Sequence, residues 1–288
     1  MKVGIAQFSM SNELLDNQNK AINVIEKLSE KGAELIILPE LFATPYFCQE
    51  EDPKNFAYAE TIPGNFTDQL SEIAKKRNIC IVASLFEKSE PSIFFNTIAF
   101  ISPLGLLGKY RKTHIPDDPK YYEKFYFAPG NLGYKVFPCK DELIGTLICW
   151  DQWFPEAARI TALLGAKVLV YPTAIGWHPE EKDEFGSKQL QAWLNVQRGH
   201  AIANGAFVVT VNRIGFESNS SGDGIEFWGN SFVVNPYGEI LHQSKSDTED
   251  NIIIDLDLTI LEEFRSGWPF FRDRRVDLYS EILKLSSD

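Results

Sequence analysis

The sequence predicts an α/β fold with two β-sheets inside and helices outside. Three observations predict it. Short apolar runs alternate along the chain with longer segments whose apolar residues recur at helical spacing. These runs are numerous enough for two sheets. They are also apolar on both faces, so the sheets need cover on both sides, which helices supply.

The first half of the chain predicts strands and helices in turn. Residues 2–10 alternate like a half-buried strand, and apolar residues then recur at helical spacing from Leu14 to Leu28, before a stop at Gly32. The elements expected next are a strand at 34–40, a helix at 66–77, a strand at 79–88, and a hairpin of strands 94–102 and 105–115 joined through "PLG".

The second half repeats this rhythm. A strand at 143–149 precedes a helix at 155–164 that Gly165 ends, and "KVLVYP" is the following strand. The elements expected after it are a long helix at about 184–204, a strand at 206–214, a hairpin across "NPYG" at 235–238 and a last strand at 251–258.

Length and composition indicate one globular domain over residues 1–288. The chain is 44% hydrophobic and 13% aromatic and has no Pro/Gly-rich linker. It lacks an apolar leader and a run of about 18 apolar residues, so we expect a soluble, cytoplasmic protein without membrane association. A net charge of -12 opposes nucleic-acid binding. That charge mildly favours cationic small molecules, although an acidic surface also serves solubility alone.

Three reactive side chains stand at or near the ends of predicted strands. Glu40 closes "LIILPE", Lys112 lies near the end of "GKYRKTHI", and Cys149 closes "LIGTLIC". Ligands collect beyond the carboxyl ends of strands in α/β sheets, so this placement indicates a common site.

Cys149 precedes a helix that begins at Pro155 and Glu156, and a thiol near a helix N-terminus has its thiolate favoured. The alternative is a buried apolar cysteine at a strand end. We give that plainer role to Cys48, Cys80 and Cys139, because no CxxC spacing indicates a redox or zinc motif.

Lys112 shares a strand face with Tyr110 and His114, which places an ammonium beside an aromatic ring. A lysine with a buried stem and a solvated head would give the same pattern. Glu40 follows four apolar residues and Pro39, at the edge of the core, where a surface carboxylate is the alternative. Taken together, the three residues suffice for one reaction. A carboxylate takes the thiol proton, the thiolate attacks a carbonyl or nitrile carbon, and the ammonium stabilises the oxyanion.

Three segments resemble the signature segments of the nitrilase superfamily, the carbon-nitrogen hydrolases with a Glu-Lys-Cys triad. They are "LPELF" around Glu40, "YRKTHIPD" around Lys112 and "LICWDQWFPEAAR" around Cys149, with separations of 72 and then 37 residues. The resemblance continues through "YYEKFYFAPG", "YPTAIG", "NRIG" and "FWGNSFVV", so it covers nearly the whole chain.

The resemblance implies a four-layer αββα sandwich and a homo-oligomer, with the segment from about residue 260 to 288 in subunit contacts. It also implies a second glutamate beside the triad, at Glu123, for which a solvated loop position is the alternative. The backbone N–H of Trp150 is expected to help bind the oxyanion. The chemistry needs no metal or organic cofactor, and the four histidines show no metal-ligand spacing.

"HIPDDPKYYEKFYFAPG" together with "CWDQWFPEA" resembles, more narrowly, the N-carbamoylputrescine amidohydrolase branch, which acts in polyamine synthesis from agmatine. This implies a cationic ureido-amine substrate. The candidates for contact with it are Tyr46, His114, Asp117, Asp118, Trp150 and Trp177. For Asp117 and Asp118, simple turn chemistry before Pro119 is an equal alternative.

Three other functions remain open at this point. Another enzyme of the superfamily, such as an ω-amidase, an aliphatic amidase, a nitrilase or a β-ureidopropionase-like enzyme, would keep the triad and change the pocket. A binding protein without catalysis would keep only the fold. A redox role for Cys149 is disfavoured, because no resolving cysteine lies close in sequence.

Overall fold

Two six-stranded sheets form the centre of the molecule in a computed structural model that describes residues 1–286. In each sheet three adjacent parallel strands are flanked by antiparallel ones. The first sheet has the order β15 (Asp250–Asp255), β1 (Lys2–Gln7), β2 (Leu35–Ile37), β3 (Cys80–Glu90), β4 (Ile93–Ser102) and β5 (Gly105–Arg111). The second has the order β14 (Ile240–Gln243), β13 (Phe232–Val234), β10 (Phe207–Asn212), β8 (Val168–Thr173), β7 (Glu142–Thr146) and β6 (Lys135–Cys139).

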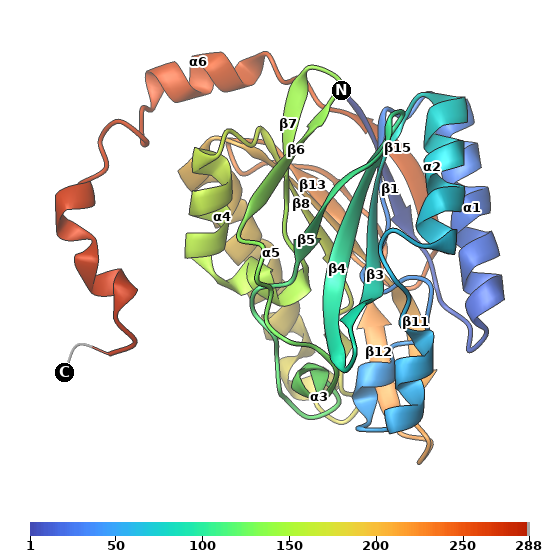
Figure 1. Ribbon diagram of the computed structural model, residues 1–288. Helices are drawn as coiled ribbons and strands as arrows, with labels where there is room; N and C mark the ends of the chain where they lie inside the picture. Colours follow the sequence, from blue (N-terminus) through green and yellow to red (C-terminus); the bar gives the residue numbers. More distant parts are fainter. Residues whose placement is uncertain (287–288) are drawn as a thin grey trace.

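Helices cover the outer face of each sheet, which completes four layers (Figure 1). On one side lie α1 (Leu14–Glu30) and α2 (Asn65–Arg77), and on the other lie α4 (Pro155–Leu163) and α5 (Lys182–Asn204). The prediction of an αββα sandwich is therefore confirmed.

Side chains that alternate between the two faces of a strand explain why both faces of each sheet are buried. Val3 and Ile5 of β1 belong to the core between the sheets, where the rings of Phe100 and Phe137 stack with centroids 4.9 Å apart. In β2, Leu35 and Ile37 face the same core, whereas Ile36 between them packs against α1 and α2. One strand therefore serves two hydrophobic cores, as its continuous apolar sequence requires.

Smaller elements gather at one end of the sandwich. A three-stranded sheet joins β11 (Ile214–Ser218), β12 (Gly224–Trp228) and β9 (Gly176–Trp177), and the short helix α3 (Glu123–Tyr126) lies at the same end (Figure 1). The sequence patterns predicted none of these four elements, nor β6, because all five are short.

The chain closes with α6 (Ile260–Gly267) and an arm that leads away from the sheets (Figure 1). Leu261 and Phe264 anchor α6 in the core. Beyond Phe271 the arm, residues 272–286, exposes apolar side chains, among them Ile282 at 64% and Leu283 at 86%.

Most predicted elements occur within a few residues of their expected bounds, but the three strands that lead to the predicted site residues end early. β2 ends at Ile37, so Glu40 follows the strand and does not close it. β5 ends at Arg111, so Lys112 follows the strand. β7 ends at Thr146, and Cys149 begins a 3₁₀ helix, Cys149–Trp153, instead of closing the strand. No helix in residues 1–286 is long and apolar enough to cross a bilayer.

Candidate active site

The three predicted site residues meet where the two sheets end together. Glu40 lies just beyond β2 and Lys112 just beyond β5, both in the first sheet, whereas Cys149 lies beyond β7 in the second. The Glu40 N–H donates to the Thr173 carbonyl at 3.3 Å, which joins the sheet edges at this point. The site is therefore built across the seam between the sheets.

Lys112 is the centre of the cluster. Its Nζ lies 2.8 Å from Oε1 of Glu40 and 2.6 Å from Oε2 of Glu123, and all three side chains are 0–1% exposed. One ammonium thus pairs with two carboxylates away from water, where unpaired charges are costly. The structure brings Glu123 beside the triad and removes the solvated-loop alternative.

Glu40 keeps one oxygen free. Its Oε1 accepts from Lys112 and from Nδ2 of Asn96 at 2.7 Å, and Asn96 accepts in turn from the Ser84 hydroxyl at 3.1 Å. Its Oε2 accepts no hydrogen bond from residues 1–286. A fixed carboxylate with one free oxygen is suited to accept a proton.

Cys149 has a backbone φ of +38°, an uncommon value for a residue with a side chain. Asp151 holds this turn, because its carboxylate accepts from the Ile148 N–H at 2.9 Å and the Tyr110 hydroxyl at 2.6 Å. His114 adds two bonds to the same carboxylate, from its N–H at 3.0 Å and from Nδ1 at 2.7 Å. The residues after β5 therefore fix the cysteine turn after β7.

Burial raises the pKa of the Cys149 thiol well above its usual value, and the nearby Glu40 reinforces the shift while Lys112 opposes it. The expectation that a helix N-terminus favours the thiolate of Cys149 is therefore wrong. α4 begins only at Pro155, six positions later, and the thiol is only 5% exposed. Reaction then requires a base that takes the proton as the thiol attacks.

The charged groups of the cluster shift one another's pKa values. Burial alone would lower the pKa of Lys112, but attraction to Glu123 and Glu40 raises it well above its usual value, so the ammonium stays charged. Burial raises the pKa of Glu123 to about 7, an effect that Lys112 opposes and Glu40 reinforces. Two carboxylates and one ammonium therefore leave a buried negative charge that a proton near neutral pH can cancel.

A pocket of about 620 Å³ opens in front of Cys149 and Glu123. Three indole rings, of Trp150, Trp153 and Trp228, contribute to its lining. Its size and apolar walls suit a small organic molecule whose reacting carbon reaches Cys149.

Carboxylates also line this pocket, at Asp118, Glu180 and Glu181. Lys120 pairs with Glu180 at 3.3 Å and with Asp223 at 2.8 Å. Asp118 and Glu181 form no ion pair within the part of the chain that the structure describes, so they are the carboxylates available to a cationic ligand.

The other residues predicted for substrate contact lie around the pocket and do not line it. The Tyr46 hydroxyl donates to Oε1 of Glu123 at 2.8 Å from behind. His114 is engaged by Asp151, and Asp117 is exposed outside the pocket. Trp177 donates from Nε1 to the Gly186 carbonyl, and its ring faces the ammonium of Lys182 at 4.8 Å.

Sequence reasoning missed Asn96, Asp151 and Arg213, all buried. Asn96 interrupts the apolar run of β4, and Arg213 follows the apolar run of β10. A polar residue in or at the end of such a run needs a partner, and that was the available signal. Asp151 stands two positions after Cys149, where its carboxylate completes the turn.

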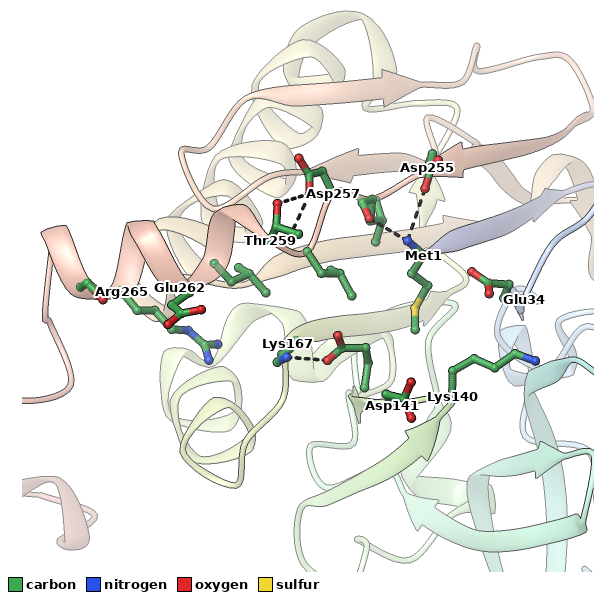
Figure 2. A pocket seen from close by; sticks show the side chains of 15 residues that line it. Met1, Glu34, Lys140, Asp141, Lys167, Asp255, Asp257, Thr259, Glu262 and Arg265 are labelled. Atoms are coloured by element: carbon green, nitrogen blue, oxygen red, sulfur yellow. Dashed lines mark hydrogen bonds and ion pairs between the residues drawn. The ribbon is translucent and has the colours of Figure 1, made fainter.

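A larger hollow, of about 1140 Å³, lies at the opposite end of the sheets. Figure 2 shows Glu34 and Lys167, which precede β2 and β8, among its labelled residues. Two ion pairs lie within it, Met1 with Asp255 at 3.3 Å and Lys167 with Glu142 at 2.6 Å. It faces the amino ends of the parallel strands and contains no member of the Glu40 cluster, so the smaller pocket is the candidate site. Residues 1–286 contain no group of three or more His, Cys, Asp or Glu side chains that could hold a metal ion.

The chain is similar to known proteins along nearly its whole length. The chain is 40% identical to an N-carbamoylputrescine amidase of Oryza sativa subsp. japonica, over 100% of this chain and 96% of that protein. It is 39% identical to a citrullinase of Francisella tularensis, over 99% of this chain and 98% of the relative. A crystal structure of a carbon-nitrogen hydrolase from Helicobacter pylori G27 superposes with a TM-score of 0.95 at 40% identity, with 99% of each chain covered. Residues 2–266 match the sequence model of the carbon-nitrogen hydrolases, and the chain belongs to that family.

Proposed function

We propose that the protein is an amidohydrolase that converts N-carbamoylputrescine and water to putrescine, carbon dioxide and ammonia. The observation that carries this proposal is the position of Cys149 at the floor of a pocket, beside a carboxylate with one free oxygen and a buried ammonium. Relatives of about 40% identity that carry this activity in their names support the choice of substrate. We place the reaction in the cytoplasm, in the synthesis of putrescine from agmatine.

In the first half of the reaction, Oε2 of Glu40 takes the proton of Cys149 while the sulfur attacks the ureido carbon. The oxyanion that forms accepts from the Trp150 N–H and from Lys112. An ammonium has three N–H donors, so with one directed to Glu40 and one shared by the oxygens of Glu123, a third serves the substrate. The carbon–nitrogen bond breaks, and putrescine leaves with the proton from Glu40.

In the second half, Glu40 takes a proton from water, which attacks the thiocarbamate carbon. The carbon–sulfur bond breaks, the thiol recovers its proton, and the released carbamic acid decomposes to carbon dioxide and ammonia. No electron transfer occurs in either half, so the reaction needs only the residues of this chain and water.

The tail of the substrate is recognised by charge and by aromatic surface. Four methylenes lie against the tryptophans of the pocket, and the terminal ammonium meets Asp118 and Glu181. Because Lys120 already pairs with Glu180, these two carboxylates retain the charge that selects a cation. Citrulline, which carries a carboxylate beside its ammonium, is the main competing substrate because of the citrullinase relative.

We propose that the protein is a homo-oligomer in which a second copy of the chain covers the exposed apolar side chains of the arm, residues 272–286. The outer face of α4 adds Ile160, Leu163 and Leu164, each more than 40% exposed. Apolar surface of this extent is costly in a monomer, and self-association buries it without another partner.

Replacing Cys149 with Ser or Ala is expected to abolish hydrolysis and leave the fold intact, because it removes the nucleophile and keeps the buried volume similar. Ammonia release and circular dichroism measure the two effects. Cys48→Ser, Cys80→Ser and Cys139→Ser are the matched controls and should keep their activity per folded molecule. Turnover without the Cys149 thiol would contradict its assignment.

The dependence of kcat/KM on pH should reflect the ionisation of Glu123. Below pH about 7 Glu123 takes up a proton, and Lys112 then pairs with Glu40 alone, which opposes proton transfer from the thiol. Above pH about 7 Glu123 is ionised and shares the ammonium. We therefore expect kcat/KM to rise with pH through about 7, and Glu123→Gln to lose this limb along with part of its activity. The same limb in Glu123→Gln, measured from pH 5.5 to 9 as ammonia release, would exclude Glu123 as its source.

The enzyme should discriminate among ureido compounds by the charge of the tail that the substrate carries. N-carbamoylputrescine is expected to have a kcat/KM at least about a hundredfold above those of N-carbamoyl-β-alanine and citrulline, because an acidic pocket repels a carboxylate. Asp118→Asn/Glu181→Gln should raise KM for N-carbamoylputrescine about tenfold or more. The matched neutral substrate n-butylurea should be unaffected by this change. Preference for an acid-tailed or plain amide substrate would overturn the choice of substrate and leave the family assignment standing.

Removal of residues 272–288 is expected to reduce the size of the assembly, because it deletes the exposed apolar arm and leaves α6 in place. Light scattering after size-exclusion chromatography measures this at micromolar concentrations. Leu104→Ser, at a side chain 90% exposed in the turn before β5, is the control and should not change the mass. A monomeric full-length chain, or a truncated chain of unchanged assembly size, would refute the arm as a subunit contact.

A further inference from the structure

The segment from Glu40 to Tyr46 carries two groups of the site but belongs to no helix or strand. Leu41 has a φ of +49°, in the left-handed region that residues with side chains rarely adopt. The segment is buried, and within it the Leu41 carbonyl accepts from the N–H and the hydroxyl of Thr44, each at 3.1 Å. The carbonyls of Glu40 and Thr44 take donors from elsewhere in the protein.

Arg213 supplies these donors from the opposite sheet. It follows β10 directly and is completely buried. Its Nη2 donates to the carbonyls of Glu40 at 2.6 Å and Leu41 at 3.0 Å, and its Nη1 donates to that of Thr44 at 3.4 Å. One guanidinium thus holds the backbone on both sides of the strained Leu41.

Glu217 completes the arrangement from β11. Its Oε1 accepts from Nη1 of Arg213 at 2.8 Å, and its Oε2 accepts from the Tyr46 N–H at 2.6 Å. The pair therefore holds the segment at its start through Arg213 and at its end through Glu217. The Tyr46 hydroxyl then donates to Glu123, so both carboxylates of the Lys112 cluster depend on this pair.

We propose that Arg213 and Glu217 form a positioning pair that sets the geometry of Glu40, and of Glu123 through Tyr46, for the reaction at Cys149. The proposal rests on the function proposed above. Neither residue lines the pocket, so the pair acts through the residues that it holds.

The geometry requires a guanidinium. Its planar fork presents several donors in fixed directions, and its Cζ lies 5.2 Å from the ring centroid of Phe227 and 5.7 Å from that of Tyr46. A lysine keeps the charge, but a single ammonium cannot reach three carbonyls and the carboxylate together. Arg213→Lys therefore keeps the positive charge and removes the planar fork of donors, so it tests the geometry alone.

The test compares Arg213→Lys and Glu217→Gln with the wild type as full-length protein. Steady-state kinetics with N-carbamoylputrescine should show kcat reduced about tenfold or more and KM changed less than about threefold, since displacement of a catalytic group by about 1 Å can cost a hundredfold. Iodoacetamide labelling of Cys149, followed by mass spectrometry between pH 6 and 9, should be slowed at least threefold in both variants at neutral pH. Labelling needs no substrate, so a wild type that labels Cys149 but does not hydrolyse N-carbamoylputrescine would refute only the proposed function.

Arg265→Lys is the matched control. Its guanidinium also bridges two backbone carbonyls, those of Gly205 at 2.9 Å and Ala166 at 3.1 Å, but at the far end of the sheets (Figure 2). Its kcat and labelling rate should stay within twofold of the wild type even where its melting temperature falls. Wild-type kcat and labelling rate per folded molecule in Glu217→Gln, the milder variant, would overturn the positioning role, as would an equal loss in Arg265→Lys.

Discussion

One buried ammonium shared by two carboxylates is the interaction on which the site depends. Lys112 lies within 3 Å of both Glu40 and Glu123, and none of the three side chains is exposed by more than 1%. Removing Lys112 from this cluster would leave both carboxylates without a cationic partner in a medium that solvates them poorly. The surrounding structure accordingly satisfies these groups through Asn96 and Tyr46, and within residues 1–286 leaves without a partner Oε2 of Glu40, the oxygen to which we assign the proton transfer.

Two uncommon backbone conformations lie next to this cluster, and each is held by a buried polar side chain. Leu41 follows Glu40 and is spanned by Arg213, while Cys149 begins a turn closed by Asp151. Such conformations persist where their surroundings over-determine them, and they concentrate at functional sites. Arg213 bonds across from another element, and Asp151, in the same 3₁₀ turn as Cys149, is held in place by Tyr110 and the His114 N–H. The strain at each position is therefore balanced by tertiary contacts.

The sequence predicted the layered fold well, because its strands and long helices repeat their apolar residues with clear periods. It did not predict β9, β11 or α3, which are too short to show a period and are held by contacts between distant segments. It also identified Glu40, Lys112, Glu123 and Cys149, which the structure brings together. The tail-binding residues were less predictable, because whether a carboxylate such as Asp118 lines a pocket, or one such as Asp117 does not, depends on a single turn of backbone. The sequence also placed the Cys149 thiol beside the N-terminus of α4, but a 3₁₀ turn separates the two in the structure.

The division of the site between two sheets has a consequence for how its activity can fail. The base and the ammonium belong to one sheet and the nucleophile to the other, and backbone hydrogen bonds from Glu40 to Thr173 and from Ile214 to Phe8 join the two sheets at this end. Sliding of one sheet over the other by a fraction of an ångström would separate proton acceptor from thiol while every strand stayed intact. We therefore expect substitutions among the apolar side chains between the sheets, such as Phe100 and Phe137, to change the reactivity of the site from a distance. The hydrophobic interior of this protein is in that sense part of its catalytic alignment.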